Sequence, residues 1–188
     1  MEYKLATSTW DDLEINAIQD VIKTDKFSMG PKVEEFEKQF AQYFGSKYAV
    51  MCSSGSTANL LMTASLFFSK KPKLKAGDEI IVPAVSWSTT YFPLQQYGLK
   101  LKFVDIDLNT LNYNSDDLEC AVSSKTKAIM VVNLLGNSND FNKINEIIGN
   151  RDIIVIEDNC ESMGAKFEDK FCGTHGLMGT FSTFFSHH

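Results

Sequence analysis

The sequence predicts an α/β fold in which a mostly parallel sheet carries helices on both faces. Short, nearly continuous apolar runs recur along the chain, at 79–82, 101–104, 127–132 and 152–156. Strands with this pattern are typical of a sheet that is buried on both faces, and such sheets are mostly parallel. Stretches with helical spacing lie between several of these runs, which is the order expected of strand–helix–strand units.

Two helices are predicted ahead of these strands. In residues 10–24 the apolar side chains recur at helical spacing, and Asp11 and Asp12 suit the first turn of a helix. A second helix is predicted over 33–44, where Gly45 would end it.

Five further segments complete the predicted order of elements. Residues 48–52 and 179–185 have the apolar character of strands, and 58–68, 116–122 and 141–148 have that of helices. The sequence contains no internal repeat, low-complexity tract or linker, so a single domain is expected over its whole length.

The composition is that of an ordinary globular protein and excludes several classes of partner. The 188 residues are 44% hydrophobic and 22% charged, with a formal net charge of -6. An acidic balance argues against non-specific binding to nucleic acid or to an anionic membrane surface. No apolar run approaches the roughly 20 residues that span a membrane, and the N-terminus lacks the features of a signal peptide. We therefore expect a soluble, cytoplasmic protein with neither nucleic acid nor membrane among its partners.

The four cysteines, at positions 52, 120, 160 and 172, form no C-x-x-C pair. Their spacings fit no zinc or disulfide pattern. We therefore expect four free thiols in a reducing compartment, and no metal site.

The turn at 53–57 is a candidate phosphate site because it leads from the predicted strand 48–52 into an apolar helix. Its small residues let backbone N–H groups approach an anion, and the start of a helix favours negative charge. The alternative is an ordinary helix N-cap formed by Ser or Thr. The turn is neither a Walker A loop nor a G-x-G-x-x-G fingerprint, so the pattern disfavours ATP and NAD.

A pair of carboxylates, Glu157 and Asp158, follows the predicted strand 152–156. The carboxyl ends of parallel strands face the ligand crevice in open sheets, where a carboxylate can bind a metal, a ribose or a protonated ring nitrogen. A helix N-cap is the alternative for Asp158. Glu161 could point toward the same site or complete a capping box.

Trp87 lies just past the predicted strand 79–82. An aromatic side chain in this position can stack on a flat cofactor ring, and packing in the core or at an interface is the alternative. The sequence therefore offers a candidate wall for a ring near the candidate phosphate and carboxylate sites.

His187 and His188 end the sequence directly after an apolar segment. Adjacent histidines can provide a general base or a metal pair, and they can also be the remainder of an affinity tag. The residues before them continue the local pattern of the strand, which favours the first two interpretations.

Together the signals place a phosphate cradle, a stacking aromatic and a carboxylate at the carboxyl ends of successive strands. A pyridoxal phosphate site needs these parts: an anchor for the phosphate, a wall for the ring and an acid opposite the ring nitrogen. Each signal is weak alone, and their combination predicts such a site.

In its motifs and their order, the sequence resembles the DegT/StrS sugar aminotransferase family of fold-type I pyridoxal phosphate enzymes. The resemblance runs from about Thr9 to the last residue. It implies an aspartate aminotransferase-like large domain, which agrees with the fold predicted above. The matching segments, in chain order, are Gly30-Pro31, Ser54-Gly55-Ser56-Thr57, Asp78 to Pro83, Phe103 to Asp107, Glu157-Asp158, Gly164-Ala165 and Gly176 to Ser182.

The resemblance also implies the residues that bind the cofactor, pyridoxal 5'-phosphate or its pyridoxamine form. They are Gly55, Ser56, Thr57 and Ser182 for the phosphate, Trp87 for the face of the ring and Asp158 for the ring nitrogen.

Two departures from the family pattern favour one branch of it. Most relatives carry a catalytic lysine five residues after the serine at 182, and here that position is His187. Glu161, which we also expect at the cofactor, stands where aminotransferases usually carry Gln or His. Both departures resemble the 3-dehydratases that act on a GDP-4-keto-6-deoxyhexose in the biosynthesis of colitose, an O-antigen sugar. Iron–sulfur-dependent dehydratases share a histidine at this position, but three stretches look closer to the first group: Pro83 to Tyr91, Asn133 to Gly136 and Asp158 to Gly164.

The activity implied by this resemblance is removal of the C3 hydroxyl from a GDP-4-keto-6-deoxymannose-type substrate, with L-glutamate as amino donor. A lysine can hold the cofactor covalently, whereas imidazole forms no stable link but remains a competent base near neutral pH. His187 would therefore be the catalytic base. A nucleotide-sugar 4-aminotransferase, which would need a lysine at this position, and an inactive fragment remain alternatives.

For domain organisation, the resemblance assigns residues 1–188 to an N-terminal segment and the major part of the cofactor-binding large domain. The family continues into a smaller C-terminal domain that this sequence does not contain. Relatives are dimers in which the partner supplies part of each site, so a homodimer is expected.

Overall fold

The computed structural model describes residues 8–185 and 187, which form two compact units, 1–51 and 52–188. The sequence has no linker composition at this boundary, so it predicted one domain where the structure has two units. Each unit is described by itself below.

The first unit contains two helices, α1 (Asp12–Lys23) and α2 (Pro31–Phe44). The side chain of Asp11 accepts a hydrogen bond from the backbone of Leu13 and caps α1. Gly45 ends α2 in the left-handed conformation, with φ of 70°, which glycine adopts without steric cost. Both predicted helices are confirmed.

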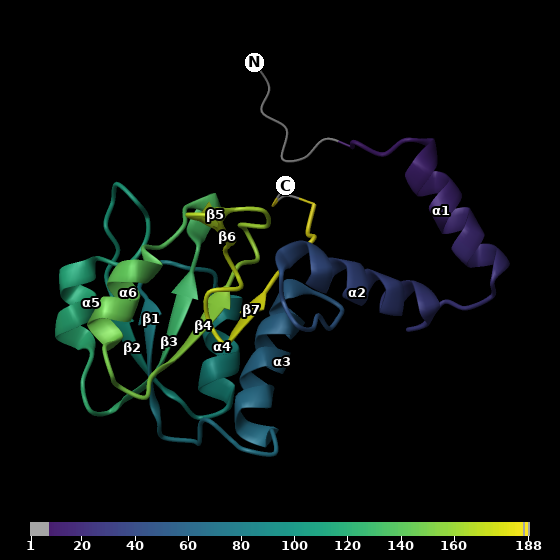
Figure 1. Cartoon of the computed structure of the whole chain (residues 1–188). Helices are drawn as coiled ribbons and strands as arrows, with labels where there is room; N and C mark the ends of the chain where they lie inside the picture. The colour runs from purple at the N-terminus through teal and green to yellow at the C-terminus, as the bar shows by residue number, and fades with distance from the viewer. Residues whose placement is uncertain (1–7, 186, 188) are drawn as a thin grey trace. The chain divides into compact units, whose positions relative to one another are not determined.

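The second unit is built on a parallel sheet of five strands in the order β2-β1-β3-β4-β7 (Figure 1). All four neighbouring pairs are parallel. The strands are β1 (Glu79–Pro83), β2 (Lys100–Val104), β3 (Thr126–Val132), β4 (Ile154–Asp158) and β7 (Met178–Thr180). Because the strands are parallel, their carboxyl ends lie at one edge of the sheet.

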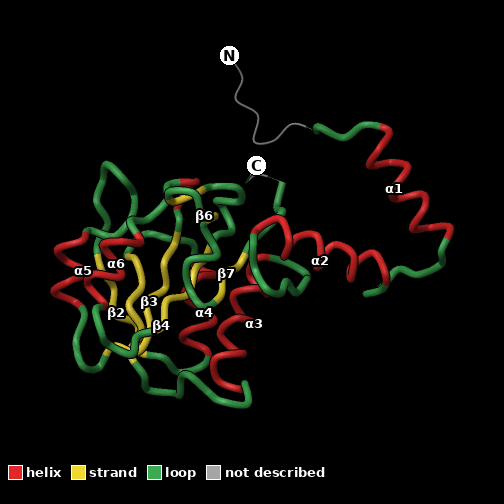
Figure 2. The backbone as a smooth tube through the Cα atoms, in the orientation of Figure 1, coloured by secondary structure: helices red, strands yellow, loops and turns green. Residues whose placement is uncertain are grey.

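Two layers of helices cover this sheet, as Figure 2 shows. Helices α3 (Gly55–Phe68) and α4 (Ser88–Gln96) lie on one face, and α5 (Ser115–Ala121) and α6 (Phe141–Ile148) lie on the other. The predicted α/β class, with a mostly parallel sheet and helices on both faces, is confirmed.

Successive strand residues fill two separate cores, one under each helical layer. Ile80 and Val82 pack with the helices α3 and α4, whereas Ile81 packs with α5 and α6. All three side chains are fully buried. The alternation of side chains along a strand therefore explains why the apolar runs in the sequence are continuous.

Three small elements lie outside these layers. The 3-10 turn η1 (Leu134–Gly136) follows β3, and the strands β5 (Lys166–Phe167) and β6 (Lys170–Phe171) form an antiparallel hairpin between β4 and β7. In the part of the chain that the structure describes, no helix is long and apolar enough to cross a membrane.

The prediction of a strand at 48–52 is wrong, because this segment has no regular structure. The residues Tyr48 and Val50 are 75% and 67% exposed. The backbone N–H of Met51 donates to the Glu37 carboxylate at 2.7 Å instead of joining a strand ladder. An apolar run alone does not make a strand, since its backbone groups also need a partner strand.

Two other boundaries differ from the sequence prediction. The strand predicted at 152–156 begins and ends two residues later, so Glu157 and Asp158 are its last residues. The strand predicted at 179–185 is confined to β7, and residues 181–184 have no regular structure. Both shifts place polar residues at the end of the sheet.

Helix α4 was missed because Pro93 lies inside it. Proline has no backbone N–H and cannot donate to the carbonyl four residues earlier, so its presence argues against a helix interior. The carbonyl of Thr89, which loses this donor, accepts a hydrogen bond from the side chain of Asn59 at 3.3 Å. A tertiary contact thus replaces the missing helical hydrogen bond.

Ile129→Ala tests the buried sheet core. Ile129 is fully buried in the middle of β3, so the substitution should lower the free energy of unfolding by about 2–5 kcal/mol. Leu108→Ala is the control, because Leu108 is 85% exposed, and it should change stability by about 0.5 kcal/mol or less. Equal effects of the two substitutions in urea denaturation would contradict the described core.

Candidate active site

The candidate site lies at the carboxyl end of the sheet, around Asp158. This residue ends β4 and is in register with Val132 of β3 and Thr180 of β7. Only 6% of Asp158 is exposed. A carboxylate is costly to bury without hydrogen-bond donors, so its partners indicate what the fold does there.

Three donors surround the carboxylate of Asp158. Oδ2 accepts hydrogen bonds from Asn59 Nδ2 at 2.8 Å and from Thr90 Oγ1 at 2.7 Å. Oδ1 accepts one from the backbone N–H of Cys160 at 3.1 Å. The donors come from α3, from α4 and from the turn after β4, so this side chain ties three segments together.

The side chain of Glu157 lies on the opposite face of the sheet from that of Asp158. Its side chain is fully buried and accepts hydrogen bonds from the backbone N–H groups of Gly173 and Gly176 at 2.5 and 2.6 Å. Neighbouring strand residues point to opposite faces, so Glu157 holds the loop before β7 while Asp158 faces α3 and α4. Of the predicted carboxylate pair, only Asp158 is therefore available to the candidate site.

No helix follows β4, so the capping alternatives for Asp158 and Glu161 do not apply. Residues 159–165 form turns. Oε2 of Glu161 is buried and has no hydrogen-bond partner within the described residues. A buried polar atom in a native structure normally has a partner, so Glu161 is suited to receive a donor from a ligand.

The turn before α3 is both a helix cap and an open N-terminus. Ser54 is the N-cap and accepts a hydrogen bond from the N–H of Thr57 at 3.2 Å, and the Thr57 hydroxyl donates to the Ser54 carbonyl at 2.8 Å. The capping alternative is therefore realised for Ser54 and Thr57. Gly55 and Ser56 begin the helix, where N–H groups lack helical acceptors and attract anions.

Ser182 lies against this turn, although it is 127 residues further along the chain. A Cβ atom added to Gly55 would come within 3.0 Å of Ser182 Cβ and 2.7 Å of Cys160 Sγ. Real Cβ atoms rarely approach other heavy atoms so closely, so a larger residue here would require Cys160 or Ser182 to shift. The structure thus brings Gly55 and Ser182 together, as a shared phosphate site requires.

Trp87 and His187 have no described contact with Asp158. Trp87 is the N-cap residue of α4, three residues before Thr90, and 71% of it is exposed. His187 is half-buried, its N–H donates to the Phe184 carbonyl at 3.0 Å, and its ring packs against that of Phe184. His188 lies outside the described residues. The roles predicted for Trp87 and His187 stay predictions.

All four cysteines are free thiols, as predicted. Burial, reinforced by the charge of Asp158, raises the pKa of the Cys160 thiol strongly. No cluster of His, Cys, Asp or Glu that could hold a metal ion occurs among the described residues.

Three residues of this site were not found from the sequence: Asn59, Thr90 and Thr180. Asn59 stands inside the apolar run of α3, where a buried amide is unusual, and this was the available signal. Thr90 lies on the helix that Pro93 obscured. Threonine is common in strands, so Thr180 gave no signal.

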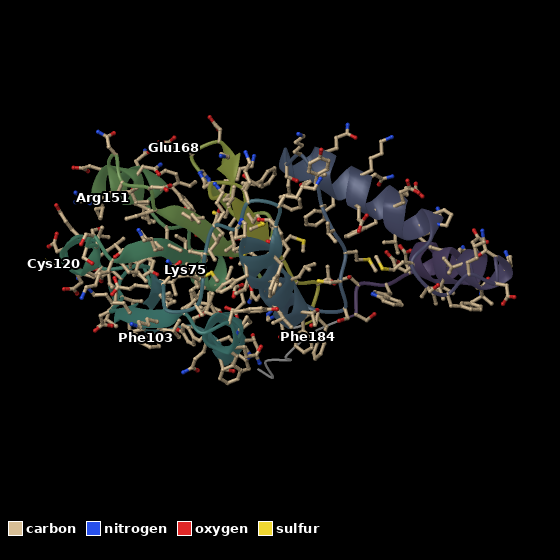
Figure 3. All side chains as sticks on the ribbon, turned by 90° about the horizontal axis from the view of Figure 1, so that it is seen from below. Lys75, Phe103, Cys120, Arg151, Glu168 and Phe184 are labelled. Atoms are coloured by element: carbon tan, nitrogen blue, oxygen red, sulfur yellow. The ribbon has the colours of Figure 1, made fainter. Side chains whose placement is uncertain are left out.

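Cysteine reactivity tests the environment of Cys160. At about pH 8.5, near the ordinary pKa of a thiol, iodoacetamide should modify the exposed Cys120 much faster than Cys160 (Figure 3). A raised pKa leaves less thiolate, the reactive form, at a given pH. The rates are measured by peptide mass spectrometry and should converge in denaturant. Equal rates in the folded protein would contradict the described burial.

The close approach of Gly55 and Cys160 is tested by a double-mutant cycle. Gly55→Ala should destabilise the protein by about 1–3 kcal/mol because the added methyl group overlaps Cys160 Sγ. Cys160→Ala removes that sulfur, so the double variant should be more stable than the sum of the single effects predicts. Strictly additive free energies of unfolding would contradict the contact.

Several known proteins have sequences and structures similar to this chain. The chain is 69% identical over 188 residues to the GDP-4-keto-6-deoxy-D-mannose 3-dehydratase of Escherichia coli O55:H7. That match covers 100% of this chain and 48% of the relative, so the chain spans about half the length of the curated relatives it matches.

Two crystal structures of GDP-4-keto-6-deoxymannose-3-dehydratase are also similar. Each has a TM-score of 0.96 and 68% sequence identity, and covers 98% of this chain and 48% of its own. One contains a trapped PLP–glutamate geminal diamine. The other is a histidine-to-asparagine mutant with bound GDP-perosamine.

A family model matches residues 9–188, which is almost the whole chain. The parallel sheet, the carboxylate at the end of β4 and the glycine at the start of α3 agree with the resemblance seen in the sequence. The chain belongs to the DegT/DnrJ/EryC1/StrS aminotransferase family.

Proposed function

We propose that this chain is part of a pyridoxal phosphate-dependent 3-dehydratase that acts on a GDP-4-keto-6-deoxymannose-type sugar and uses L-glutamate as amino donor. The observation that carries the proposal is the buried Asp158 carboxylate at the carboxyl end of β4, in a chain that has His187 in place of a lysine. The 69% identity to a 3-dehydratase supports the same reaction class.

The described residues fit the cofactor at both of its ends. The first turn of α3 offers N–H groups of Gly55 and Ser56 to a phosphate, and the Ser182 side chain lies beside Gly55. Asp158 provides an acceptor for a protonated ring nitrogen, and the partnerless Glu161 Oε2 can accept from a donor on the ring or its substituents.

The cofactor, when bound in its amine form, supplies an amine that condenses with a ketone and a ring that accepts electrons. The residues of this chain bind, orient and move protons around it. Asp158 holds a proton on the ring nitrogen, which strengthens the ring as an electron acceptor. Trp87, exposed beside the start of α4, has an indole face available to cover the ring.

His187 provides the base. We propose that its imidazole removes a proton from the C4′ carbon of the cofactor, because a neutral imidazole is a competent base near pH 7. Imidazole forms no stable covalent link to the cofactor, so His187 cannot return an amine to the sugar as a lysine-containing aminotransferase does. Expulsion of the C3 hydroxyl is thereby favoured over amino transfer.

The overall reaction balances with glutamate as reductant. Glutamate is oxidised by two electrons to 2-oxoglutarate and ammonia, with uptake of one water. The sugar loses its C3 hydroxyl as water and gains a C3–H bond, which consumes the same two electrons. The crystal structures of the similar dehydratase, with a PLP–glutamate adduct in one and GDP-perosamine in the other, support this pair of substrates.

The remaining expectations from the sequence belong to the same proposal. Residues 1–188 would form the N-terminal segment and major part of a cofactor-binding large domain, in a cytoplasmic homodimer that contributes to colitose or O-antigen synthesis. The four free thiols support a reducing compartment.

The replacement His187→Asn tests this function. The natural-length protein is incubated with pyridoxamine phosphate, glutamate and GDP-4-keto-6-deoxymannose, and 2-oxoglutarate and ammonia are measured. Loss of a general base should lower turnover by about 100-fold or more.

His175→Asn is the matched control, because His175 stacks on Phe141 at a centroid distance of 4.0 Å and has no role in the proposed chemistry. Its turnover should equal that of the wild type. Full turnover in His187→Asn would overturn the assignment of the base, and the absence of any product with the wild-type protein would overturn the function.

A further inference from the structure

Asp158 is held by neutral donors that form two converging chains of hydrogen bonds. In the first chain, the Ser86 hydroxyl oxygen lies 2.9 Å from the Thr90 hydroxyl oxygen. The Thr90 oxygen in turn lies 2.7 Å from Asp158 Oδ2. Since a hydroxyl has one proton, Thr90 donates to the carboxylate and accepts from Ser86. Every donor on this side therefore points toward Asp158.

The second chain passes through Asn59. The Thr180 hydroxyl donates to Asn59 Oδ1 at 2.7 Å, which fixes the orientation of the amide, so that Nδ2 faces Asp158 at 2.8 Å. The other N–H of Nδ2 donates to the Thr89 carbonyl that Pro93 leaves without a helical partner. All hydrogen-bonding groups of the Asn59 side chain are thereby used.

Both chains end at Oδ2 of the carboxylate and leave Oδ1 with fewer strong donors. A carboxylate accepts about four hydrogen bonds, two at each oxygen. Oδ2 has two donors, Asn59 and Thr90, whereas the backbone N–H of Cys160 donates to Oδ1, and the Cys160 thiol also interacts with this carboxylate. Because a thiol is a weak donor, Oδ1 is the oxygen that is better able to accept a further hydrogen bond.

Among the described residues, no ion pair includes Asp158, because each pair joins two residues three positions apart on one helix. The titratable groups near Asp158 are Tyr91 on α4, and Cys160 and Glu161 after β4. Burial raises the pKa of Tyr91 and of Cys160, and the charge of Asp158 raises both further. The N–H and O–H donors to Asp158 are thus all neutral groups.

We propose that Asn59 and Thr90 are positioning residues that keep Asp158 ionised and present its Oδ1 to the protonated ring nitrogen of the cofactor. Hydrogen bonds to the charged form of a carboxyl group favour that form. In the pair between Asp158 and the ring nitrogen, the two donors at Oδ2 keep the shared proton on nitrogen. Without them the pair shifts toward a neutral carboxylic acid and a neutral pyridine, which is a weaker electron acceptor.

This inference rests on the proposed function but makes its own prediction. Thr90→Val removes the hydroxyl at nearly constant volume, and Asn59→Leu removes the amide. Each loss should shift the proton equilibrium between Asp158 and the ring nitrogen by about tenfold or more, the effect of one hydrogen bond to a charged group. Thr90→Ser retains the hydroxyl and should behave like the wild type.

The readout is the 15N NMR shift of 15N-labelled pyridoxamine phosphate bound to the natural-length protein, which reports protonation of the ring nitrogen without turnover. The shift should lie at the protonated value in the wild type and in Thr90→Ser, and move toward that of neutral pyridine in Thr90→Val and Asn59→Leu. Turnover should fall with these shifts while KM for the sugar changes little.

Thr63→Val is the matched control for a buried hydroxyl. Thr63 is fully buried one turn after Asn59, and its hydroxyl donates only to the carbonyl of its own helix at 2.8 Å. Its 15N shift should equal that of the wild type.

The outcomes separate the two proposals. A wild-type protein that does not bind the cofactor, or binds it with a neutral ring nitrogen, overturns the proposed function. A protonated nitrogen in the wild type that stays protonated in both Thr90→Val and Asn59→Leu leaves the function standing and overturns the positioning role. If one variant fails to fold, the other still decides, because each removes a different donor.

Discussion

The buried carboxylate of Asp158 is the interaction on which the rest of the site depends. A charge with so little exposure costs free energy unless donors replace the lost water, and here they come from α3, from α4 and from the turn after β4. The same contacts fix the helix that starts at the candidate phosphate turn and the helix that starts after Trp87. One polar centre thereby holds both candidate binding elements against the end of the sheet.

The sequence predicted most of the fold because the sheet is buried on both faces. Strands such as β3 must be apolar throughout, which makes them visible in the sequence, and α6 was predicted with its observed bounds, 141–148. The prediction of a strand at 48–52 was wrong, because an apolar pattern does not show whether a neighbouring strand is present to pair with it. Helix α4 was not predicted, because a proline such as Pro93 is unfavourable inside a helix. The hydrogen bond that Pro93 cannot make to Thr89 is replaced by one from Asn59, which is distant in sequence.

The positions of the candidate site residues, though not their roles, could be predicted in part. The positions of Gly55 and Asp158 follow from rules about strand ends and helix starts, which are local. The proximity of Ser182 to Gly55 and the network around Asp158 join residues about a hundred positions apart, so no local pattern contains them. The different roles of Glu157 and Asp158 could not be predicted from local pattern either. Successive residues of β4 point to opposite faces of the sheet, so Glu157 binds a loop while Asp158 faces the helices.

A crystal structure of the natural-length protein with pyridoxamine 5'-phosphate tests the central claim most directly. The account predicts the ring nitrogen within hydrogen-bonding distance of Asp158 Oδ1, and the phosphate at the N–H groups of Gly55 and Ser56 with the Ser182 hydroxyl beside it. A cofactor bound elsewhere, or a ring nitrogen that contacts a group other than Asp158, would contradict it.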